Sequence, residues 1–189
     1  QRAGVQVVMI TGDNKDTAAA IARQAGLLKD PQDLALTHDQ LAALSDEQVM
    51  EKMPRLRVVA RALPQDKSRL VRLAQQTGLV AGMTGDGIND APALKLADVG
   101  FAMGGGTEVA KEAGDIVILD DNFASLTRAI LYGRTIFKSI RKFIVFQLTM
   151  NLCAVGVSIL GPFFGIDAPI TVVQMLWVNI IMDTLAGLA

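Results

Sequence analysis

The feature that most constrains this chain is a long stretch without formal charge in its second half. Residues 143–165, FIVFQLTMNLCAVGVSILGPFFG, run for 23 positions without Asp, Glu, Lys or Arg. A helix needs about 20 predominantly apolar residues to cross the hydrocarbon core of a bilayer. A second apolar run, residues 170–189, is interrupted only by Asp183. The sequence therefore predicts a transmembrane α-helical hairpin in a lipid bilayer, with the second helix truncated.

Basic residues gather immediately before the first of these two runs. Residues 124–142, ASLTRAILYGRTIFKSIRK, have the pattern of an amphipathic helix and contain three arginines and two lysines. Because Lys and Arg near the end of a span mark its cytoplasmic side, this segment is expected in the cytoplasm. We predict a cytoplasmic stalk helix over residues 124–142 that continues into the span at 143–165. The protein is then a multi-pass membrane protein whose preceding domain is cytoplasmic.

Residues 1–123 show short apolar runs that alternate with amphipathic stretches. We predict strands at 5–10, 34–37, 57–61, 79–84, 99–103 and 115–119, and helices at 15–26, 39–53, 64–78, 90–97 and 107–113. Strands that alternate with helices predict an α/β fold, a parallel sheet with helices on both faces. The formal net charge of −1 gives no indication of a nucleic-acid partner.

Two of the predicted strands end in the same three residues, T-G-D. They lie in MITGDN (9–14) and GMTGDGIND (82–90). Ligands of open parallel sheets bind at the carboxyl ends of the strands, so both turns are expected at one site. Thr11, Gly12 and Asp13 offer a hydroxyl, backbone N–H groups and a carboxylate near a helix start, which suits a phosphate. An ordinary strand-to-helix turn is the alternative for these three residues.

The second turn adds a candidate metal ligand. Asp86 follows a strand on a glycine-rich turn, and Mg²⁺ prefers hard oxygen ligands such as a carboxylate. An isolated D-G pair more often only closes a turn, but the paired turns favour the ligand. Asn89 and Asp90 follow directly, and Asp90 also suits the N-cap of the next helix. Lys67, in the first turns of a predicted helix, is either a site residue or a solvated surface lysine.

Two further features receive no chemical role. The stretch MGGGTEVA (103–110) lacks the lysine and the spacing of a Walker phosphate loop, so we predict a tight turn with Thr107 starting a helix. His38 is the only histidine and has no visible partner in the sequence.

The predicted hairpin carries a small set of polar side chains. Asp183 is an ionisable group inside a span, where such groups are expensive and usually functional. Asn179 lies four residues earlier on the same helix face, and Gln147 and Asn151 form a similar pair on the first span. Oxygen-bearing side chains from two helices can form a site for a hard cation. Hydrogen bonding between the helices is the alternative, and it is favoured for Gln147.

Several of these stretches together resemble a known family. MITGDNKDTA, ARALPQDKSRLV and MTGDGINDAPALKLADVGFAMGGGTEVAKEAGDIVILDDNF closely resemble the phosphorylation domain of P-type cation-transporting ATPases. FQLTMN and VQMLWVNIIMDTLAGLA are similar to transmembrane helices five and six of the Ca²⁺-pumping branch, and more so to its plasma-membrane type. The resemblance implies a haloacid-dehalogenase-like Rossmann domain. It also implies ATP as substrate, Mg²⁺ as cofactor, Ca²⁺ as the exported ion, an aspartyl-phosphate intermediate, and location in the plasma or cell membrane.

The resemblance also implies roles for residues at matching positions. Asp86 would ligate Mg²⁺, and Lys67 would contact the aspartyl phosphate. Asn89 and Asp90 would complete the phosphate pocket, which the first T-G-D turn, Thr11, Gly12 and Asp13, would line. The transported Ca²⁺ would be held by Asn179 and Asp183, with Asn151 as a further candidate.

The sequence departs from the pattern of the family in three respects: one motif is absent, and two positions lack oxygen-bearing side chains. The nucleophile motif D-K-T-G-T is absent, so we expect a fragment of a translocase that is inactive alone and has the rest of its own chain as its partner. Ala154 and Met182 stand where the sarcoplasmic-reticulum type has oxygen-bearing residues, which predicts one Ca²⁺ site. A pump for Na⁺, K⁺, H⁺ or Mn²⁺ stays open as an alternative. A soluble phosphatase of the same superfamily is a second one, although the two apolar runs argue against it.

Overall fold

A computed structural model describes residues 4–166 and 170–186 of the chain, without the side chains of Val172, Asp183, Leu185 and Ala186. The chain divides into two compact units, Gln1–Leu126 and Thr127–Ala189. The turn expected at GIDAP and the end of the second predicted span lie partly outside the described residues. The two units are described one after the other.

The first unit alternates strands and helices throughout. Its elements are β1 (Met9–Ile10), α1 (Lys15–Gln24), β2 (Leu34–Thr37), α2 (His38–Ala42), α3 (Asp46–Lys52), the 3₁₀ turn η1 (Met53–Arg55), β3 (Leu56–Ala60), α4 (Pro64–Gln76), β4 (Gly82–Gly85), the 3₁₀ turn η2 (Ile88–Asp90), α5 (Ala91–Leu96), β5 (Val99–Met103), α6 (Glu108–Ala113) and β6 (Ile116–Ile118). This order confirms the predicted alternation.

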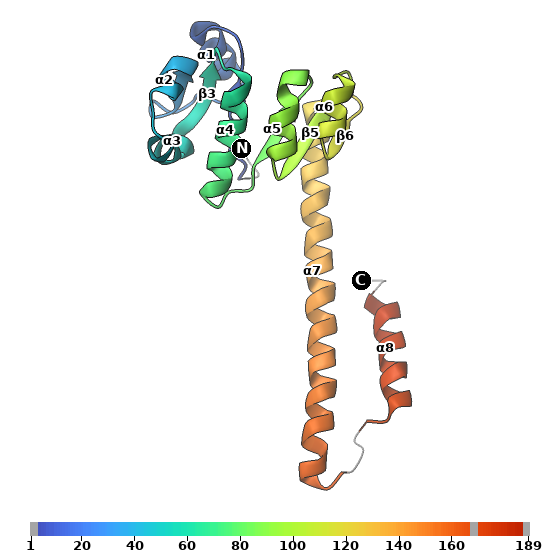
Figure 1. Cartoon of the computed structure of the whole chain (residues 1–189). Helices are drawn as coiled ribbons and strands as arrows, with labels where there is room; N and C mark the ends of the chain where they lie inside the picture. The colour runs from blue at the N-terminus through green and yellow to red at the C-terminus, as the bar shows by residue number, and fades with distance from the viewer. Residues whose placement is uncertain (1–3, 167–169, 187–189) are drawn as a thin grey trace. The chain divides into compact units, whose positions relative to one another are not determined.

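The strands form two parallel sheets of three strands each, where the sequence predicted one sheet. The first sheet has the order β1-β3-β2 and the second the order β4-β5-β6. Met9 pairs with Val58 in the first sheet, and Met83 pairs with Gly100 in the second. Figure 1 shows α4 between the two sheets. All strand pairs are parallel, so the carboxyl ends of the strands in each sheet lie at one edge.

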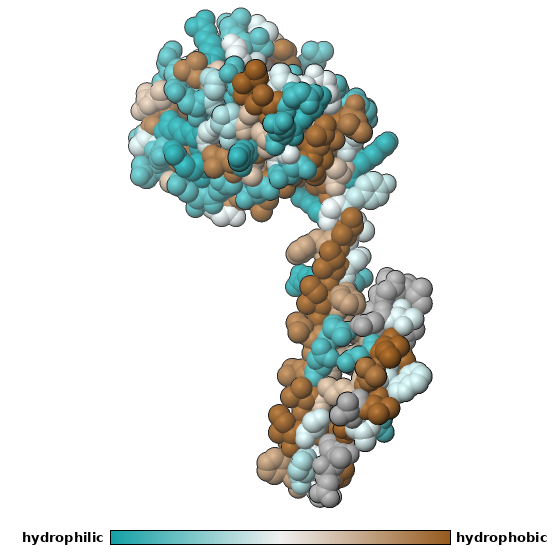
Figure 2. Space-filling view, turned by 45° about the vertical axis from the view of Figure 1, so that its right-hand side comes forward, coloured by the Kyte–Doolittle hydropathy of each residue, from teal (hydrophilic) through white to brown (hydrophobic). Residues whose placement is uncertain are grey.

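Helices cover the first sheet on both faces, as predicted, and α4 links it to the second. Val58 and Ala60 of β3 pack with the alanines of α1, whereas Val59 packs with Leu70 and Leu73 of α4. Val71, which follows Leu70 in α4, packs instead with Met83 and with the helices of the second sheet. The helix therefore contributes to two hydrophobic clusters. The surface over them is mostly hydrophilic, with scattered apolar residues (Figure 2).

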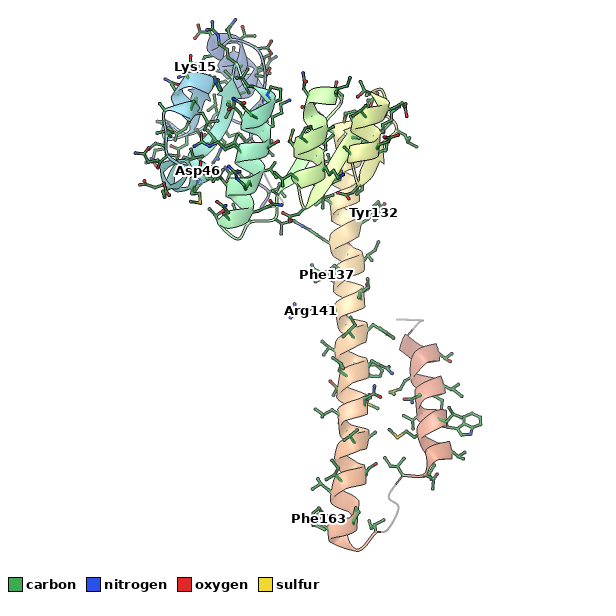
Figure 3. All side chains as sticks on the ribbon, viewed as in Figure 1. Lys15, Asp46, Tyr132, Phe137, Arg141 and Phe163 are labelled. Atoms are coloured by element: carbon green, nitrogen blue, oxygen red, sulfur yellow. The ribbon has the colours of Figure 1, made fainter. Side chains whose placement is uncertain are left out.

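The single helix predicted over 39–53 is wrong, because the structure has two helices there. Ser45 begins α3, and its hydroxyl accepts a hydrogen bond from the backbone N–H of Gln48. Arg69 of α4 donates to the carbonyl oxygens of Leu41 and Leu44, at 2.9 and 2.8 Å, and forms an ion pair with Asp46, which Figure 3 labels. Ser45 is in an extended conformation, so the chain leaves the helical path after α2 and α3 starts anew, while Arg69 binds carbonyl oxygens at this break.

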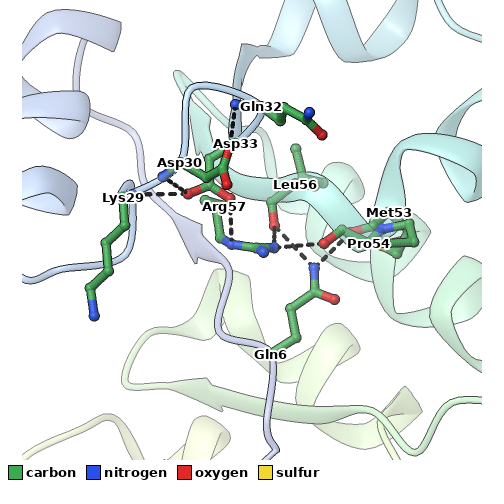
Figure 4. Close-up of polar contacts among 9 residues, drawn as sticks. All are labelled: Gln6, Lys29, Asp30, Gln32, Asp33, Met53, Pro54, Leu56 and Arg57. Atoms are coloured by element: carbon green, nitrogen blue, oxygen red, sulfur yellow. Dashed lines mark hydrogen bonds and ion pairs between the residues drawn. The ribbon is translucent and has the colours of Figure 1, made fainter. Parts of the chain in front are cut away.

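The strand predicted over 5–10 is shorter than expected and is not fully buried. Only Met9 and Ile10 pair with β3. Ahead of them, the side-chain amide of Gln6 donates to the carbonyl oxygens of Met53 and Leu56 (Figure 4). The side chain thus takes the place of backbone pairing at this end of the strand.

The second unit contains two apolar helices. The first, α7 (Phe123–Leu160), begins at the end of the first unit, continues through the predicted stalk and span, and is followed by the 3₁₀ turn η3 (Gly161–Phe164). The second, α8 (Val172–Ala186), runs back beside α7 (Figures 1 and 2). Within the described residues, one helical stretch, 123–164, is long and apolar enough to cross a membrane, and the apolar stretch Val173–Met182 is shorter. No residue of α7 is fully buried, and most of its large apolar side chains are exposed.

Candidate functional site

The best-defined polar site lies at the carboxyl end of β4. After Gly85 the chain turns through Asp86 and Gly87 into η2, which ends at Asp90. The carboxylate of Asp90 folds back over this turn. Its Oδ2 accepts hydrogen bonds from the backbone N–H groups of Gly87, at 3.2 Å, and Asp86, at 3.3 Å. Asp90 is buried, so its carboxylate is a fixed part of the turn.

Asp86 has the opposite environment. It is exposed, and its carboxylate makes no hydrogen bond or ion pair with any described residue. Asp90 occupies the N-cap position of α5, as the sequence predicted, but its side chain makes no capping hydrogen bond there because its carboxylate is engaged on the turn. The turn therefore holds one carboxylate in place and presents the other one free.

The turn depends on a glycine at the last position of β4. A Cβ added at Gly85 would lie 2.4 Å from Cβ and 2.7 Å from Cγ of Asp90. Real carbon atoms without a bond between them do not approach so closely, so no other residue fits without displacing Asp90.

A second glycine-rich segment supports the turn from the other side. The backbone N–H of Thr107 donates to the carbonyl oxygen of Asp86 at 2.8 Å, and a Cβ at Gly106 would lie 2.8 Å from that oxygen. Thr107 also caps α6 by accepting from the N–H of Ala110, as predicted. Sequence reasoning did not connect this segment with the site, although three successive glycines are a signal of close backbone approach.

Lys67 reaches the same turn from α4. Its Nζ contacts Oδ1 of Asp90, and its side chain is only 20% exposed. The structure thus brings together two of the predicted site residues that are 23 positions apart in the sequence. Lys67 is not a freely solvated surface lysine, the alternative that the sequence had left open.

The first T-G-D turn forms a separate local structure at the end of β1. The hydroxyl of Thr11 donates to the carboxylate of Asp13 at 2.8 Å, and Gly12 is exposed. The backbone carbonyls of Thr11 and Asp13 accept from Ala62 and Arg61, the residues that follow β3. In the described part of the chain, no hydrogen bond or ion pair joins this turn to the turn at Asp86.

Two other residues of the α/β unit complete the picture. Asn89 lies in η2 with an exposed side chain, next to Asp90. His38 was given no partner from the sequence, but its Nδ1 lies 2.7 Å from Oδ2 of Asp66, the residue before Lys67. The available signal was its position directly after a strand, the same position that the T-G-D turns occupy.

The polar residues of the hairpin are less completely defined. Asn179 and Asp183 lie one turn apart on α8, and Asn179 is half-buried, but the side chain of Asp183 is outside the described part of the structure. Asn151 of α7 is exposed. The Oε1 atom of Gln147 is buried and has no hydrogen-bond partner among the described residues. The interhelical hydrogen bond favoured for it from the sequence is therefore not observed.

The site at β4 suits a metal that needs few protein ligands. No three His, Cys, Asp or Glu side chains converge anywhere in the part of the chain that the structure describes. Mg²⁺ keeps several of its waters and is usually bound through one or two carboxylates plus phosphate oxygens. The single free carboxylate of Asp86 fits that requirement.

Comparison with known proteins places these features in a family. The model of the haloacid dehalogenase-like hydrolase family matches residues 1–98, and a second model with the same description matches residues 80–130. A plasma-membrane-type calcium-transporting ATPase 12 of Arabidopsis thaliana is 50% identical over 99% of this chain and 19% of its own length. The plasma membrane calcium-transporting ATPase 1 of Mus musculus is 48% identical, over 100% of this chain and 17% of its own.

Solved structures agree with these matches. A zinc-transporting PIB-type ATPase in its E2.Pi state aligns with 99% of this chain and 24% of its own, with a TM-score of 0.64 and 30% identity. The chain spans less than a fifth of the length of the two calcium-transporting relatives.

Proposed function

The chain belongs to the haloacid dehalogenase-like hydrolase family, and on that premise we propose that it is part of a P-type ATPase that exports Ca²⁺ through an aspartyl-phosphate intermediate. The observation that carries the proposal is the end of β4, where an exposed, unpartnered Asp86 lies beside an Asp90 that is held by Lys67. Similarity to calcium-transporting ATPases over the whole chain, hairpin included, supports it.

We propose Asp86 as the ligand of Mg²⁺. Its carboxylate is exposed and is not committed to any described residue, so its charge is available to a cation. The metal, when bound, neutralises negative charge that develops on the transferred phosphoryl group. Two hydrogen bonds keep the backbone of Asp86 in place. Its N–H donates to the carboxylate of Asp90, and its carbonyl oxygen accepts from the N–H of Thr107.

The remaining site residues act on the phosphate oxygens. Lys67 supplies an ammonium group that Asp90 holds at the turn, and fixed donors of this kind stabilise charge in a transition state without having to reorganise. We propose the same role for the exposed amide of Asn89 and for the hydroxyl and N–H groups of Thr11, Gly12 and Asp13. No residue of this sequence matches the nucleophile, so an aspartate outside it attacks the γ-phosphate of ATP.

The hairpin is the membrane part in this proposal. We assign residues 1–123 to the phosphorylation domain, 124–142 to a cytoplasmic stalk helix, and 143–165 and 170–189 to transmembrane helices of a plasma-membrane protein. The continuity of α7 supports this assignment, because one uninterrupted helix joins the stalk to the first span. Such a helix can transmit movement from the phosphate site to a cation site by hinge or shear motion.

The cation site would be formed by Asn179 and Asp183, with Asn151 as a further candidate. Ca²⁺ takes six to eight oxygen ligands. The side chains of this hairpin supply only part of the oxygen ligands that one such site needs. Met182 lies next to Asp183 with a buried, apolar side chain, so it adds no oxygen. We therefore propose one Ca²⁺ per cycle.

The test of the proposal is Asp86→Asn in the intact pump, because Asn keeps the shape of the side chain and removes the charge that a metal needs. Phosphorylation by labelled ATP should then require at least about 10-fold more Mg²⁺, because changing a group that only supports a metal ligand already costs about 10- to 100-fold. Asp16→Asn, an exposed aspartate near the start of α1, is the matched control. An unchanged Mg²⁺ titration for Asp86→Asn would remove Asp86 from the proposal. A wild-type pump that forms no phosphoenzyme would refute the proposed function itself.

A further inference from the structure

The pair formed by His38 and Asp66 is not used by the proposed mechanism. The Nδ1 atom of His38 lies 2.7 Å from Oδ2 of Asp66, and Asp66 is only 3% exposed. His38 is the first residue of α2 and follows β2 directly, whereas Asp66 lies in the first turn of α4, shortly after β3. The contact therefore joins the carboxyl ends of two neighbouring strands.

The direction of this hydrogen bond follows from a second contact. Oδ2 of Asp66 also accepts from the backbone N–H of Leu63, the N-cap residue of α4, at 2.8 Å. An oxygen that already accepts one N–H is best matched by another donor, so Nδ1 of His38 carries the proton. Leu63 has no side-chain group that could cap the helix. Asp66, held by His38, therefore closes the first turn of α4.

Lys67 follows Asp66 in that same turn. Its Nζ contacts Asp90, whose other carboxylate oxygen accepts from the N–H groups of Asp86 and Gly87. The first turn of α4 is thus fixed at two places, by His38 on the side of β2 and by Asp90 on the side of β4. When the first anchor is lost, only the contact between Lys67 and Asp90 fixes this turn.

His38 has no comparable task within its own helix. The start of α2 is already closed by a capping box between Thr37 and Gln40. His38 and Asp66 also line an open cavity of about 560 Å³. Shortening His38 would enlarge a space open to solvent and would not leave a dry void, so the contact with Asp66 is its main contribution.

We propose that His38 is a positioning residue for Lys67. Through Asp66 it fixes the first turn of α4, so that Nζ of Lys67 is held at the turn of Asp86 and Asp90. This inference rests on the proposed function, because it takes phosphoryl transfer as the reaction in which Lys67 acts. His38 itself contacts no reacting atom.

The first experiment compares three variants of the intact pump. His38→Ala should slow phosphoenzyme formation about tenfold and leave the apparent KM for ATP unchanged, since misplacement by 1 Å can cost up to about 10²-fold in rate. His38→Asn should restore most of the rate, because its amide nitrogen lies as many bonds from Cα as Nδ1 does. Asp39→Asn, the adjacent exposed residue of α2, should behave as the wild type.

A double-mutant cycle tests whether the effect passes through Lys67. The double variant His38→Ala with Lys67→Ala should be no slower than Lys67→Ala alone, since residues that act through one another are not additive. Additive losses, or equal losses in His38→Ala and His38→Asn, would overturn the inference.

A second measurement does not depend on activity. The rate at which an amine reagent acetylates Lys67, followed by mass spectrometry, should rise several-fold in His38→Ala and fall back in His38→Asn. Lys95, exposed in α5, serves as the internal reference and should not change. If His38→Ala unfolds the domain, the comparison of His38→Asn with the wild type decides. A wild type that forms no phosphoenzyme would refute the proposed function, whereas unchanged labelling of Lys67 would refute the positioning role.

Discussion

Gly85→Ala is the substitution for which the site geometry predicts the sharpest effect. The new Cβ would lie 2.4 Å from Cβ, 2.7 Å from Cγ and 2.8 Å from Oδ2 of Asp90. Carbon atoms in contact lie about 3.5–4.0 Å apart, so Asp90 or β4 must move by about 1 Å. Asp90 cannot move without loss, because Lys67 and the N–H groups of the turn hold its carboxylate.

The expected cost follows from these contacts. Overpacking of a tightly packed site costs about 1–3 kcal/mol. Moving Asp90 also weakens its hydrogen bonds, each worth about 1.5–3 kcal/mol when a charged group takes part, so the upper part of the range is expected. At 1.4 kcal/mol for each factor of ten, a cost of about 2–3 kcal/mol makes local opening about 30- to 140-fold more frequent.

Hydrogen exchange measured by mass spectrometry is the suitable assay. The single Trp and single Tyr, Trp177 and Tyr132, lie in the second unit, so their fluorescence would not report on β4. With the chain held in lipid nanodiscs, the backbone amides of peptides covering residues 82–96 should exchange faster in Gly85→Ala, by the same factor as the increase in local opening. Gly82→Ala in the same strand is the matched control, because its Cβ would meet only Cε2 of Phe101, at 3.6 Å, and Val99 O. We expect the free energy of local opening in Gly82→Ala to lie within about 0.5 kcal/mol of that of the wild type. Equal exchange in the two variants would refute the steric argument.

Three further predictions concern other parts of the chain. The N–H groups of Asp30 and Lys29, with the Arg57 guanidinium, hold the pKa of Asp33 below its ordinary value (Figure 4). The stability linked to Asp33 is then present above about pH 3.9 and lost as the pH falls through its lower folded pKa, so acid unfolding of Asp33→Asn should be less steep there. Ser45→Ala removes the N-cap of α3 and should cost about 1 kcal/mol, seen as faster exchange in α3 and unchanged exchange in α2, which Thr37 caps. In the intact pump, Asp183→Asn should abolish Ca²⁺-dependent phosphorylation by ATP, and the wild type should occlude one radioactive Ca²⁺ per phosphoenzyme; a ratio of two would contradict the single site.

Local signals in the sequence located most elements of the first unit. The helix α4 begins at Pro64 and is followed by Gly78 at a φ of +80°, and α1 is followed by Gly26 at +69°. Proline fixes φ at a helical value, and glycine adopts the positive φ that ends a helix without steric cost, so the sequence predicts where such helices begin and end. The strand β5 was predicted with the bounds that it has.

The elements that were predicted wrongly depend on distant partners. The break between α2 and α3 has a local signal, the capping box of Ser45 and Gln48, and a distant partner, Arg69 of α4, which binds the carbonyl oxygens of Leu41 and Leu44. The division into two sheets depends on which strands pair, and strand pairing is a long-range property that an apolar run does not reveal. The shortened β1 depends on Gln6, whose amide bonds carbonyls about 50 positions later in the chain.

The candidate site divides in the same way. The sequence by itself determined that Asp86, Asp90 and Lys67 are candidates, because strand ends, glycines and carboxylates are local features. It also determined that the chain carries an apolar helix able to cross a bilayer, since length and hydropathy are properties of one segment. Only the tertiary structure decided that Asp90 holds Lys67, that Asp86 is left free, and that His38 contacts Asp66. Those contacts join residues 23 and 28 positions apart, and their distance in space is set by the packing of α4 between two sheets, which no local pattern contains.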